Sequence, residues 1–357
     1  MYNCSDDGLG YHNDEVTLPQ AERDDMRERR NTNRERLKNG LKKAGKPAPL
    51  EFKSQGSYAM KTMVQDPSKD YDIDDGAYFA KEDLVGPRAG ELLALEARQM
   101  VRDALDDGSF KTPPEVREKC VRVHYDAGYH LDMPIYRRVV TSDSSGKQSI
   151  YYELAASDWQ RSDARDVTMW FEDENNRQSP DKTNGRQLRR VTRELKKFAK
   201  SRSSWKGQIL SGFGITKLVT ECFKGNAERE DTSLYDTIEA IRDRLNLSLI
   251  VEHPVTPGET ITKDSDDPKA RFLRDKLSYA LDWLKPLFEA TCTREQALAC
   301  WDKVFDTDYY SNRIEKKTAQ ESAPAGLTIL TSVLLKETGS SARTQTAVRK
   351  EGGGRYA

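Results

Sequence analysis

The stretch DYDIDDGAYF at residues 70–79 decides the fold and the chemistry of this chain. In an extended strand, side chains two positions apart point to the same face. Asp72 and Asp74 would therefore present two carboxylates side by side, whereas Asp75 would face the other way. Paired carboxylates on one strand are typical of a site for hard divalent cations, which take oxygen ligands.

A second strand and a turn extend this pattern. The run HLDMPIY at 130–136 alternates in polarity, so Asp132 would join the first two carboxylates if the two strands pair. The turn at Gly56 and Ser57 offers backbone N–H groups and a hydroxyl that can hold a triphosphate. Two metal ions can activate an attacking hydroxyl and stabilise a leaving pyrophosphate. The sequence therefore predicts metal-dependent nucleotidyl transfer.

Each of these motifs has a simpler explanation when it is taken singly. A Gly-Ser pair is most often a surface turn. An Asp-x-Asp motif is most often a solvated loop or part of a calcium loop, but the later acidic ligands of the twelve-residue calcium hand are missing here. His130, two residues from Asp132, is expected to be a hydrogen-bonded structural residue rather than part of the site.

The three motifs together carry a family resemblance. QGSYAMKT at 55–62, DYDIDDGAYF at 70–79 and HLDMPIY at 130–136 resemble the DNA polymerase β-like nucleotidyltransferase superfamily. Within it they are most similar to the bacterial cGAS/DncV-like nucleotidyltransferases (CD-NTases), in particular the DncV-like cyclic dinucleotide synthase clade. The resemblance implies a bilobal α+β fold with a mixed-sheet palm, a long N-terminal spine helix and a helical C-terminal lobe.

The resemblance also implies roles for individual residues. The catalytic residues, which would bind two Mg²⁺ ions with Mn²⁺ as an alternative, would be Asp72, Asp74 and Asp132. The nucleotide-binding residues would be Gln55, Gly56, Ser57, Arg122, Lys197 and Ser211. Among these, Lys197 and Ser211 would hold the donor triphosphate, and Arg122 would read the acceptor base.

The implied activity is the synthesis of a cyclic dinucleotide, a cGAMP-type second messenger, from ATP and GTP with release of pyrophosphate in antiphage (CBASS) signalling. The alternative enzyme is a template-independent nucleotidyltransferase that modifies RNA or makes linear oligonucleotides. A third hypothesis is a nucleotide-sensing module that has lost catalysis. The presence of all three expected carboxylates argues against that loss.

Composition is consistent with this assignment. The 357 residues suffice for two lobes, and with 36% hydrophobic and 33% charged residues most helices must be amphipathic. The 58 basic and 59 acidic residues give no overall bias toward nucleic acid. No run approaches the ~18 apolar residues of a membrane span, and five cysteines without C-x-x-C spacing argue against a disulfide framework. We expect a cytoplasmic protein with neither a membrane nor a nucleic-acid partner.

The pattern along the chain predicts a nucleotidyltransferase core with the spine helix, a helical lobe and a flexible tail, at residues 1–184, 185–337 and 338–357. A polar leader is expected to about residue 17. Helices are expected at 18–44, 90–108, 186–206, 211–223, 233–245, 269–288 and 293–305. Strands beyond the first are expected at 119–125, 129–140 and 150–154.

The helix at 186–206 combines an apolar stripe with an unusual charge. The stripe consists of Leu188, Val191, Leu195 and Phe198. Nine Lys or Arg residues accompany the single acid Glu194. A charge run is usually a solvated face, but beside a triphosphate site it would supply the counter-charge for two nucleotides.

Three further segments carry hypotheses about partners. The loop at 251–269 is expected to approach the cleft, where Asp266 or Asp267 would either touch a nucleotide or stay solvated. The arginine-rich flank at 27–36 would either be a solvated helix face or contribute to the pocket of a folate-like regulator. The C-terminal GGGRYA suits conjugation by an E1/E2-like ligase, as in operons that contain such cyclases.

Overall fold

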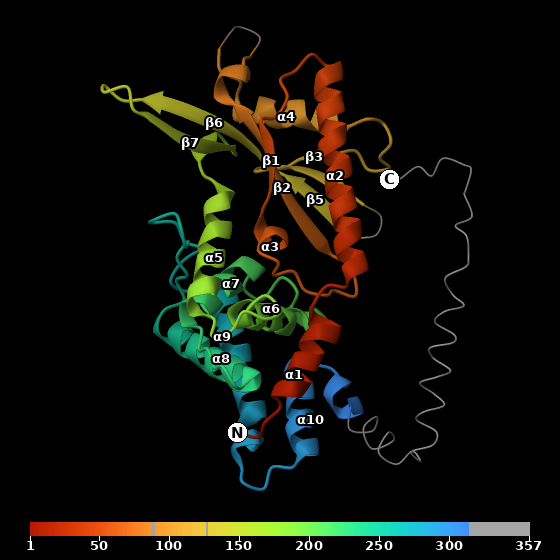
Figure 1. Ribbon diagram of the computed structural model, residues 1–357, viewed down its shortest axis with the longest axis vertical. Coiled ribbons are helices and arrows are strands. Elements are labelled where there is room, and N and C mark those ends of the chain that lie inside the picture. The colour runs from red at the N-terminus through yellow and green to blue at the C-terminus, as the bar shows by residue number, and fades with distance from the viewer. Residues whose placement is uncertain (87–89, 126–127, 314–357) are drawn as a thin grey trace, which may run out of the picture. The chain divides into compact units, whose positions relative to one another are not determined.

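The structure is a computed structural model that describes residues 1–86, 90–125 and 128–313 (Figure 1). Its described residues divide into two compact units, one spanning Asn3–Asp282 and the other containing Met1–Tyr2 and Trp283–Arg313. The predicted boundary at 184/185 stays a prediction. Part of the predicted helical lobe and the whole predicted tail, with its conjugation hypothesis, lie outside the described residues.

A mixed sheet, eight-stranded within the described residues, carries the candidate site. Its strands are β1 (Glu51–Ser54), β2 (Tyr71–Ala80), β3 (Glu115–Val116), β4 (Val121–His124), β5 (Tyr129–Met133), β6 (Ile135–Ser142), β7 (Gln148–Ala155) and β8 (Trp159–Arg161). β2 pairs antiparallel with β1 and parallel with β5 and β6. The pairing that the sequence analysis required between the two aspartate-bearing strands is therefore present.

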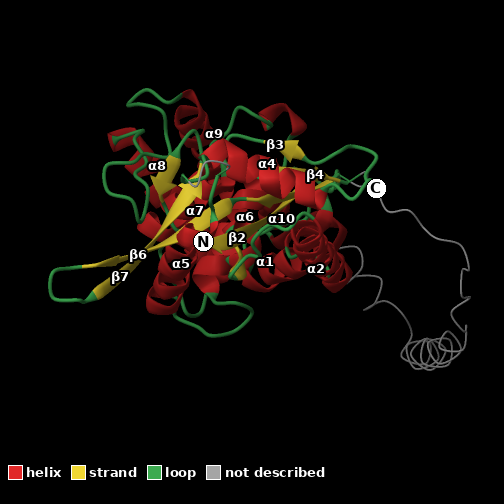
Figure 2. Cartoon of the chain, turned by 90° about the horizontal axis from the view of Figure 1, so that it is seen from above, coloured by secondary structure: helices red, strands yellow, loops and turns green. Residues whose placement is uncertain are grey.

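The predicted strand at 129–140 is interrupted at Pro134. β5 pairs with the first residues of β2 and β6 pairs with its last residues, in one unbroken parallel register. The carbonyl of Pro134 accepts a hydrogen bond from the N–H of Ala77 at 2.9 Å, but proline has no N–H to donate. β4 pairs antiparallel with β5, and β7 with β6. Figures 1 and 2 both show the β6–β7 hairpin extending beyond the rest of the sheet.

Helices pack against this sheet and build the remainder of the two units. They are α1 (Ser5–Tyr11), α2 (Gln20–Lys43), α3 (Gly56–Ala59), α4 (Ala94–Leu105), α5 (Ala164–Gln178), α6 (Gln187–Lys200), α7 (Gly212–Cys222), α8 (Glu230–Leu247), α9 (Pro268–Leu284) and α10 (Arg294–Phe305). The spine helix α2 lies so close to α4 that a Cβ at Gly40 would be 1.9 Å from the carbonyl oxygen of Ala104. Apolar residues of α2 and α4 share one buried cluster with Ile73 and Leu131 of the sheet.

Other segments also differ from the sequence-based expectations. The leader is folded, because α1 is followed by a π-helical turn at His12–Val16 and both Tyr11 and Val16 are buried. Its start is held by Asp231 of α8, which accepts hydrogen bonds from the Cys4 N–H (2.7 Å) and the Ser5 hydroxyl (2.6 Å). Helix α5 was not expected from the sequence either. No helix among the described residues is long and apolar enough to cross a membrane.

Candidate active site

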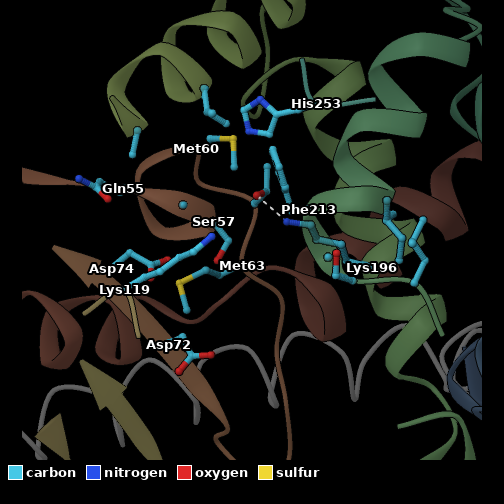
Figure 3. Close-up of a pocket in the computed structure, with 18 of the residues that line it drawn as sticks. Gln55, Ser57, Met60, Met63, Asp72, Asp74, Lys119, Lys196, Phe213 and His253 are labelled. Carbon is cyan, nitrogen blue, oxygen red and sulfur yellow. Dashed lines mark hydrogen bonds between the residues drawn. The ribbon is translucent and has the colours of Figure 1, made fainter. Parts of the chain in front are cut away.

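Strand β2 presents Asp72 and Asp74 to a cavity of about 1640 Å³, as the alternation predicts (Figure 3). Asp74 pairs in register with Asp132 of β5, so the three carboxylates belong to one face of two neighbouring strands. Asp75 points to the opposite face. There it is fully buried and accepts two hydrogen bonds from Arg34 of α2, both at 2.6 Å.

Arg122 of β4 is the direct partner of Asp132. Its Nε and Nη2 donate to the two carboxylate oxygens of Asp132, each at 2.7 Å. The same Nη2 is 3.4 Å from Oδ1 of Asp72. Arg122 thus contacts the carboxylate triad itself, and its predicted role as a reader of the acceptor base stays a prediction.

The carboxylates repel one another in a poorly solvated place. Burial, followed by the charges of Asp132 and Asp72, raises the pKa of Asp74 to about 7. Burial also raises the pKa of Asp72. Among the described residues no three potential ligands are gathered as a formed metal site, and Arg122 engages both oxygens of Asp132. The donor set nevertheless fits Mg²⁺ or Mn²⁺, since a bound cation would relieve the repulsion around Asp74.

The Gly-Ser turn lies against the second carboxylate. Gly56 has a φ of +59°, and a Cβ there would be 2.2 Å from Oδ2 of Asp74. Both the backbone conformation and the space therefore require glycine. The N–H of the preceding Gln55 donates to the carbonyl of Asp74 at 2.8 Å, and Ser57 lines the cavity next to this contact.

Gln55 lines the cavity, but its amide is already engaged, and its nucleotide-binding role stays a prediction. The side chain is buried, donates to the hydroxyl of Tyr78 at 3.1 Å and accepts from the hydroxyl of Tyr136 at 3.3 Å. The two tyrosine rings are stacked 4.6 Å apart. Gln55 therefore braces the wall behind the turn.

The basic helix α6 buries its apolar stripe, as predicted. Three of its arginines are buried too. Arg190 donates to both oxygens of Glu230 at 2.7 and 2.8 Å. Arg189 and Arg193 donate to the backbone carbonyls of residues 60 and 61, at 3.0 and 2.8 Å. These cations hold the segment after α3 against α6, so only part of the charge run can serve a nucleotide.

Four other basic residues of the run line the cavity: Lys196, Lys200, Arg202 and Lys206. Lys196 is the most buried of them, and its Nζ donates to the hydroxyl of Thr62 at 2.8 Å. Burial lowers the pKa of Lys196 to about 7. Lys200 and Lys206 pair with Asp66 and Asp70 at 2.9 and 3.0 Å.

Of the two residues predicted to hold the donor triphosphate, Ser211 lines the cavity and Lys197 does not. Ser211 caps α7, where its hydroxyl accepts a hydrogen bond from the N–H of Gly214 at 3.2 Å. The Nζ of Lys197 instead donates to the carbonyl of Gln65 at 3.3 Å. One position along a helix turns a side chain by about 100°. Of these two adjacent lysines, the one that lines the cavity is therefore Lys196.

The loop at 251–269 reaches the cavity, as expected, but through other residues than the two aspartates. His253, Thr256 and Glu259 line it. Asp267 instead accepts hydrogen bonds from three backbone N–H groups around the start of α9, and Asp266 pairs with Arg271. These lining residues could not be singled out from the sequence, because residues of a loop carry no periodic signal.

Comparison with known proteins identifies the domain that contains the carboxylates. Residues 50–136 match the family described as cyclic GMP-AMP synthase DncV-like, nucleotidyltransferase domain. The chain contains a DncV-like nucleotidyltransferase domain. It is a nucleotidyltransferase, and the resemblance drawn from its motifs is confirmed.

Solved structures of DncV and CdnC proteins share the fold. Vibrio cholerae DncV in complex with GTP and 5MTHFGLU2 is 17% identical, covers 85% of this chain and 96% of its own, and has a TM-score of 0.66. Vibrio cholerae DncV cyclic AMP-GMP synthase with the linear intermediate 5′ pppA(3′,5′)pG is 18% identical, covers 85% of this chain and 94% of its own, and has a TM-score of 0.64. The matching chain of the Escherichia coli MS115-1 CdnC:HORMA-deltaN complex is 17% identical, covers 84% of this chain and 96% of its own, and has a TM-score of 0.60. The predicted bilobal polymerase β-like fold class is confirmed.

The DncV-like domain supplies only part of the cavity. The turn at Gly56 and the strand with Asp72 and Asp74 lie within the matched residues. Lys196, Ser211 and the loop around His253 lie beyond them. The cavity therefore combines a side that lies within the matched domain with a second side that belongs to the helical part of the same compact unit.

Proposed function

We propose that this DncV-like nucleotidyltransferase is a cytoplasmic cyclic dinucleotide synthase that makes a cGAMP-type second messenger in CBASS signalling. ATP and GTP would be joined by two successive phosphodiester bonds, each formed with release of pyrophosphate. The observation that carries the proposal is the cavity, whose volume of about 1640 Å³ exceeds the roughly 300–1,000 Å³ of pockets for one small ligand. A Vibrio cholerae protein of the same fold is described as a cyclic AMP-GMP synthase with a linear dinucleotide intermediate.

The metal ions would be held by Asp72 and Asp74, which line the cavity, together with Asp132 of the neighbouring strand. A bound metal supplies activation of the acceptor ribose hydroxyl and neutralisation of charge on the leaving pyrophosphate. The chain's own groups orient the substrates. The turn at Gly56 and Ser57 offers backbone N–H groups and a hydroxyl to phosphate oxygens.

The opposite side supplies positive charge. Lys196 and Lys200 line the cavity, and charge-assisted hydrogen bonds from ammonium groups to phosphate oxygens are among the stronger polar contacts in proteins. A triphosphate beside Lys196 favours the protonated form of an amine whose pKa burial has lowered to about 7. We infer that Lys196 takes the donor-triphosphate role that the sequence analysis gave to Lys197.

The test is incubation of the pure protein with all four ribonucleoside triphosphates and Mg²⁺ or Mn²⁺, followed by mass spectrometry and linkage-specific nuclease digestion. The expected product is a cyclic dinucleotide containing one AMP and one GMP unit. Replacing Asp72 and Asp74 together by Asn should abolish it, whereas Asp83→Asn, an exposed carboxylate outside the cavity, should not. A linear product, or activity only on RNA, would favour the alternative enzyme.

The proposal extends to two partners. A Vibrio cholerae DncV structure contains 5MTHFGLU2, and we propose that a folate-like compound regulates this chain as well. The test is a thermal-shift assay with 5-methyltetrahydrofolate polyglutamate. An unchanged melting temperature would contradict the proposal. An E1/E2-like ligase is proposed to conjugate the C-terminal tail. Deletion of residues 352–357 should then abolish conjugation in cells that contain the ligase, and undiminished conjugation would contradict this proposal.

A further inference from the structure

The cavity wall contributed by α7 and the loop at 251–269 carries an aromatic corner. The rings of Phe213 and His253 are 5.4 Å apart between centroids and inclined at 60°, and both line the cavity. Figure 3 shows them with Met60 on the side of the cavity away from Asp72. Val255 also lines the cavity there, so this corner is mainly apolar, unlike the lysine-rich part that suits phosphates.

The hydrogen bonds of the His253 ring determine which of its nitrogens accepts and which donates. Its Nδ1 accepts hydrogen bonds from the backbone N–H groups of Thr256 at 3.0 Å and Val255 at 3.4 Å. Burial lowers the pKa of His253, which favours the neutral ring. A neutral ring that accepts at Nδ1 carries its proton on Nε2. Among the described residues, no hydrogen bond from this Nε2–H is present, although the side chain lines the cavity.

The loop that presents His253 is braced at its base. The backbone N–H of His253 donates to the carbonyl of Glu259 at 2.8 Å, and the N–H of Ile261 donates to the carbonyl of Val251 at 2.7 Å. A histidine on a braced loop presents its donor in one direction. This arrangement is what discrimination between similar ligands requires, because the cost of ordering the donor is met on folding.

We propose that the corner formed by Phe213 and His253 binds one nucleobase and selects guanine over adenine. Aromatic side chains are sequence-tolerant stacking surfaces for bases, so Phe213 supplies affinity for either purine. The Nε2–H of His253 supplies selectivity. Guanine places two acceptors, O6 and N7, on one edge, whereas adenine places an N6 amino donor beside N7. Because N7 accepts in both purines, the proposal places the Nε2–H opposite the substituent at C6, where it meets the O6 acceptor of guanine favourably and the N6 amino donor of adenine unfavourably.

This inference rests on the proposed function only in assuming that the cavity takes nucleotides. The competing explanation is structural: His253 would merely cap the turn at 255–256 through Nδ1. His253→Asn separates the two explanations. The Asn side-chain oxygen can accept the same backbone hydrogen bonds, as Asn does in turns, but Asn has no donor at the position of Nε2.

The experiment measures binding of non-hydrolysable GTP and ATP analogues to the full chain by calorimetry with Mg²⁺ present. His253→Asn should weaken the GTP analogue about tenfold or more, by the scale of base discrimination from such contacts, and leave the ATP analogue and the melting temperature nearly unchanged. Phe213→Leu should weaken both analogues. An unchanged ratio of the two affinities in His253→Asn, or an equal loss of both, would overturn the proposal.

Because binding is read without turnover, the outcome is independent of the product that the enzyme makes. A linear product in the previous assay would contradict the synthase assignment and leave the guanine preference intact. Conversely, a cyclic AMP–GMP product together with an unchanged affinity ratio in His253→Asn would leave the synthase assignment intact and remove His253 as the selector.

Discussion

The pair of Arg34 and Asp75 offers the sharpest test of how the spine helix supports the site. Asp75 follows directly after Asp74 in β2, is completely buried and accepts two hydrogen bonds from Arg34 of α2, both at 2.6 Å. The hydroxyl of Ser54 donates to the same carboxylate at 2.9 Å. Replacing Arg34 by Met leaves a buried carboxylate with one remaining neutral donor.

The magnitude follows from the burial of the two partners. Removing one partner of a buried ion pair costs about 3–5 kcal/mol, because the other charge stays buried without compensation. The side chain of Arg34 is 22% exposed, so solvent reaches part of the pair and the lower end of that range is expected. The matched control is Arg27→Met on the same helix. Arg27 pairs with Asp24 at 3.1 Å with both side chains about half exposed, and such a pair contributes below about 1 kcal/mol.

The assay is urea denaturation of each variant, followed by intrinsic fluorescence. Arg34→Met should lose about 3 kcal/mol of unfolding free energy. Adding Asp75→Asn to Arg34→Met should recover most of the loss, since the neutral amide needs no counter-ion. A cost for Arg34→Met no larger than that of Arg27→Met would refute the reasoning.

Three other changes probe the site. Gly56→Ala should abolish product formation while the protein stays folded, because the added methyl would lie 2.2 Å from Oδ2 of Asp74. The control Gly45→Ala should keep full activity, because Gly45 has a similar φ of +62° but no atom within 4 Å of the added methyl. Arg122→Met should tighten Mn²⁺ binding in the absence of nucleotide, measured by electron paramagnetic resonance, because Asp132 loses its competing partner; unchanged affinity would contradict this. Lys196 has a pKa lowered from 10.5 to about 7 in the folded protein, so the unfolded chain binds more protons between these values and the unfolding free energy should rise with pH there. Lys196→Met should remove that rise in urea titrations at pH 7 and pH 10, and an identical pH dependence would count against a buried neutral amine.

The strand-borne part of the site could be predicted because it depends on short-range geometry. Alternation along β2 placed Asp72 and Asp74 on one face and Asp75 on the other, and the structure has this arrangement. The pairing partner Asp132 followed from a second alternating run. Both inferences need only the two-residue period of a strand.

The helix-borne part could not be predicted to the residue. Lys197 was expected at the triphosphate, but its neighbour Lys196 lines the cavity, because the rotation of α6 about its axis is set by packing and not by its charge pattern. Arg190 likewise reads as part of a solvated basic face. Its burial depends on Glu230, forty positions away, and such partners are visible only after the fold is known.

The folded leader shows a third kind of limit. Its few apolar residues give no periodic signal, and the carboxylate that accepts hydrogen bonds from its first residues, Asp231, lies more than two hundred residues later. His253 escaped notice for a related reason. Its role as a donor depends on which ring nitrogen the turn at 255–256 engages, and that is a property of the folded loop.

Pro134 separates the part of the sheet that carries Asp132 from the part that carries the extending hairpin. β5, which carries Asp132, and β6, which begins the extending hairpin, follow the same register along β2 but have different antiparallel partners. The exposed turn at 143–147 at the tip of that hairpin can therefore accept inserted sequence. A peptide tag or a fluorophore attachment site placed there would report on the working enzyme without shifting the spacing of its carboxylates.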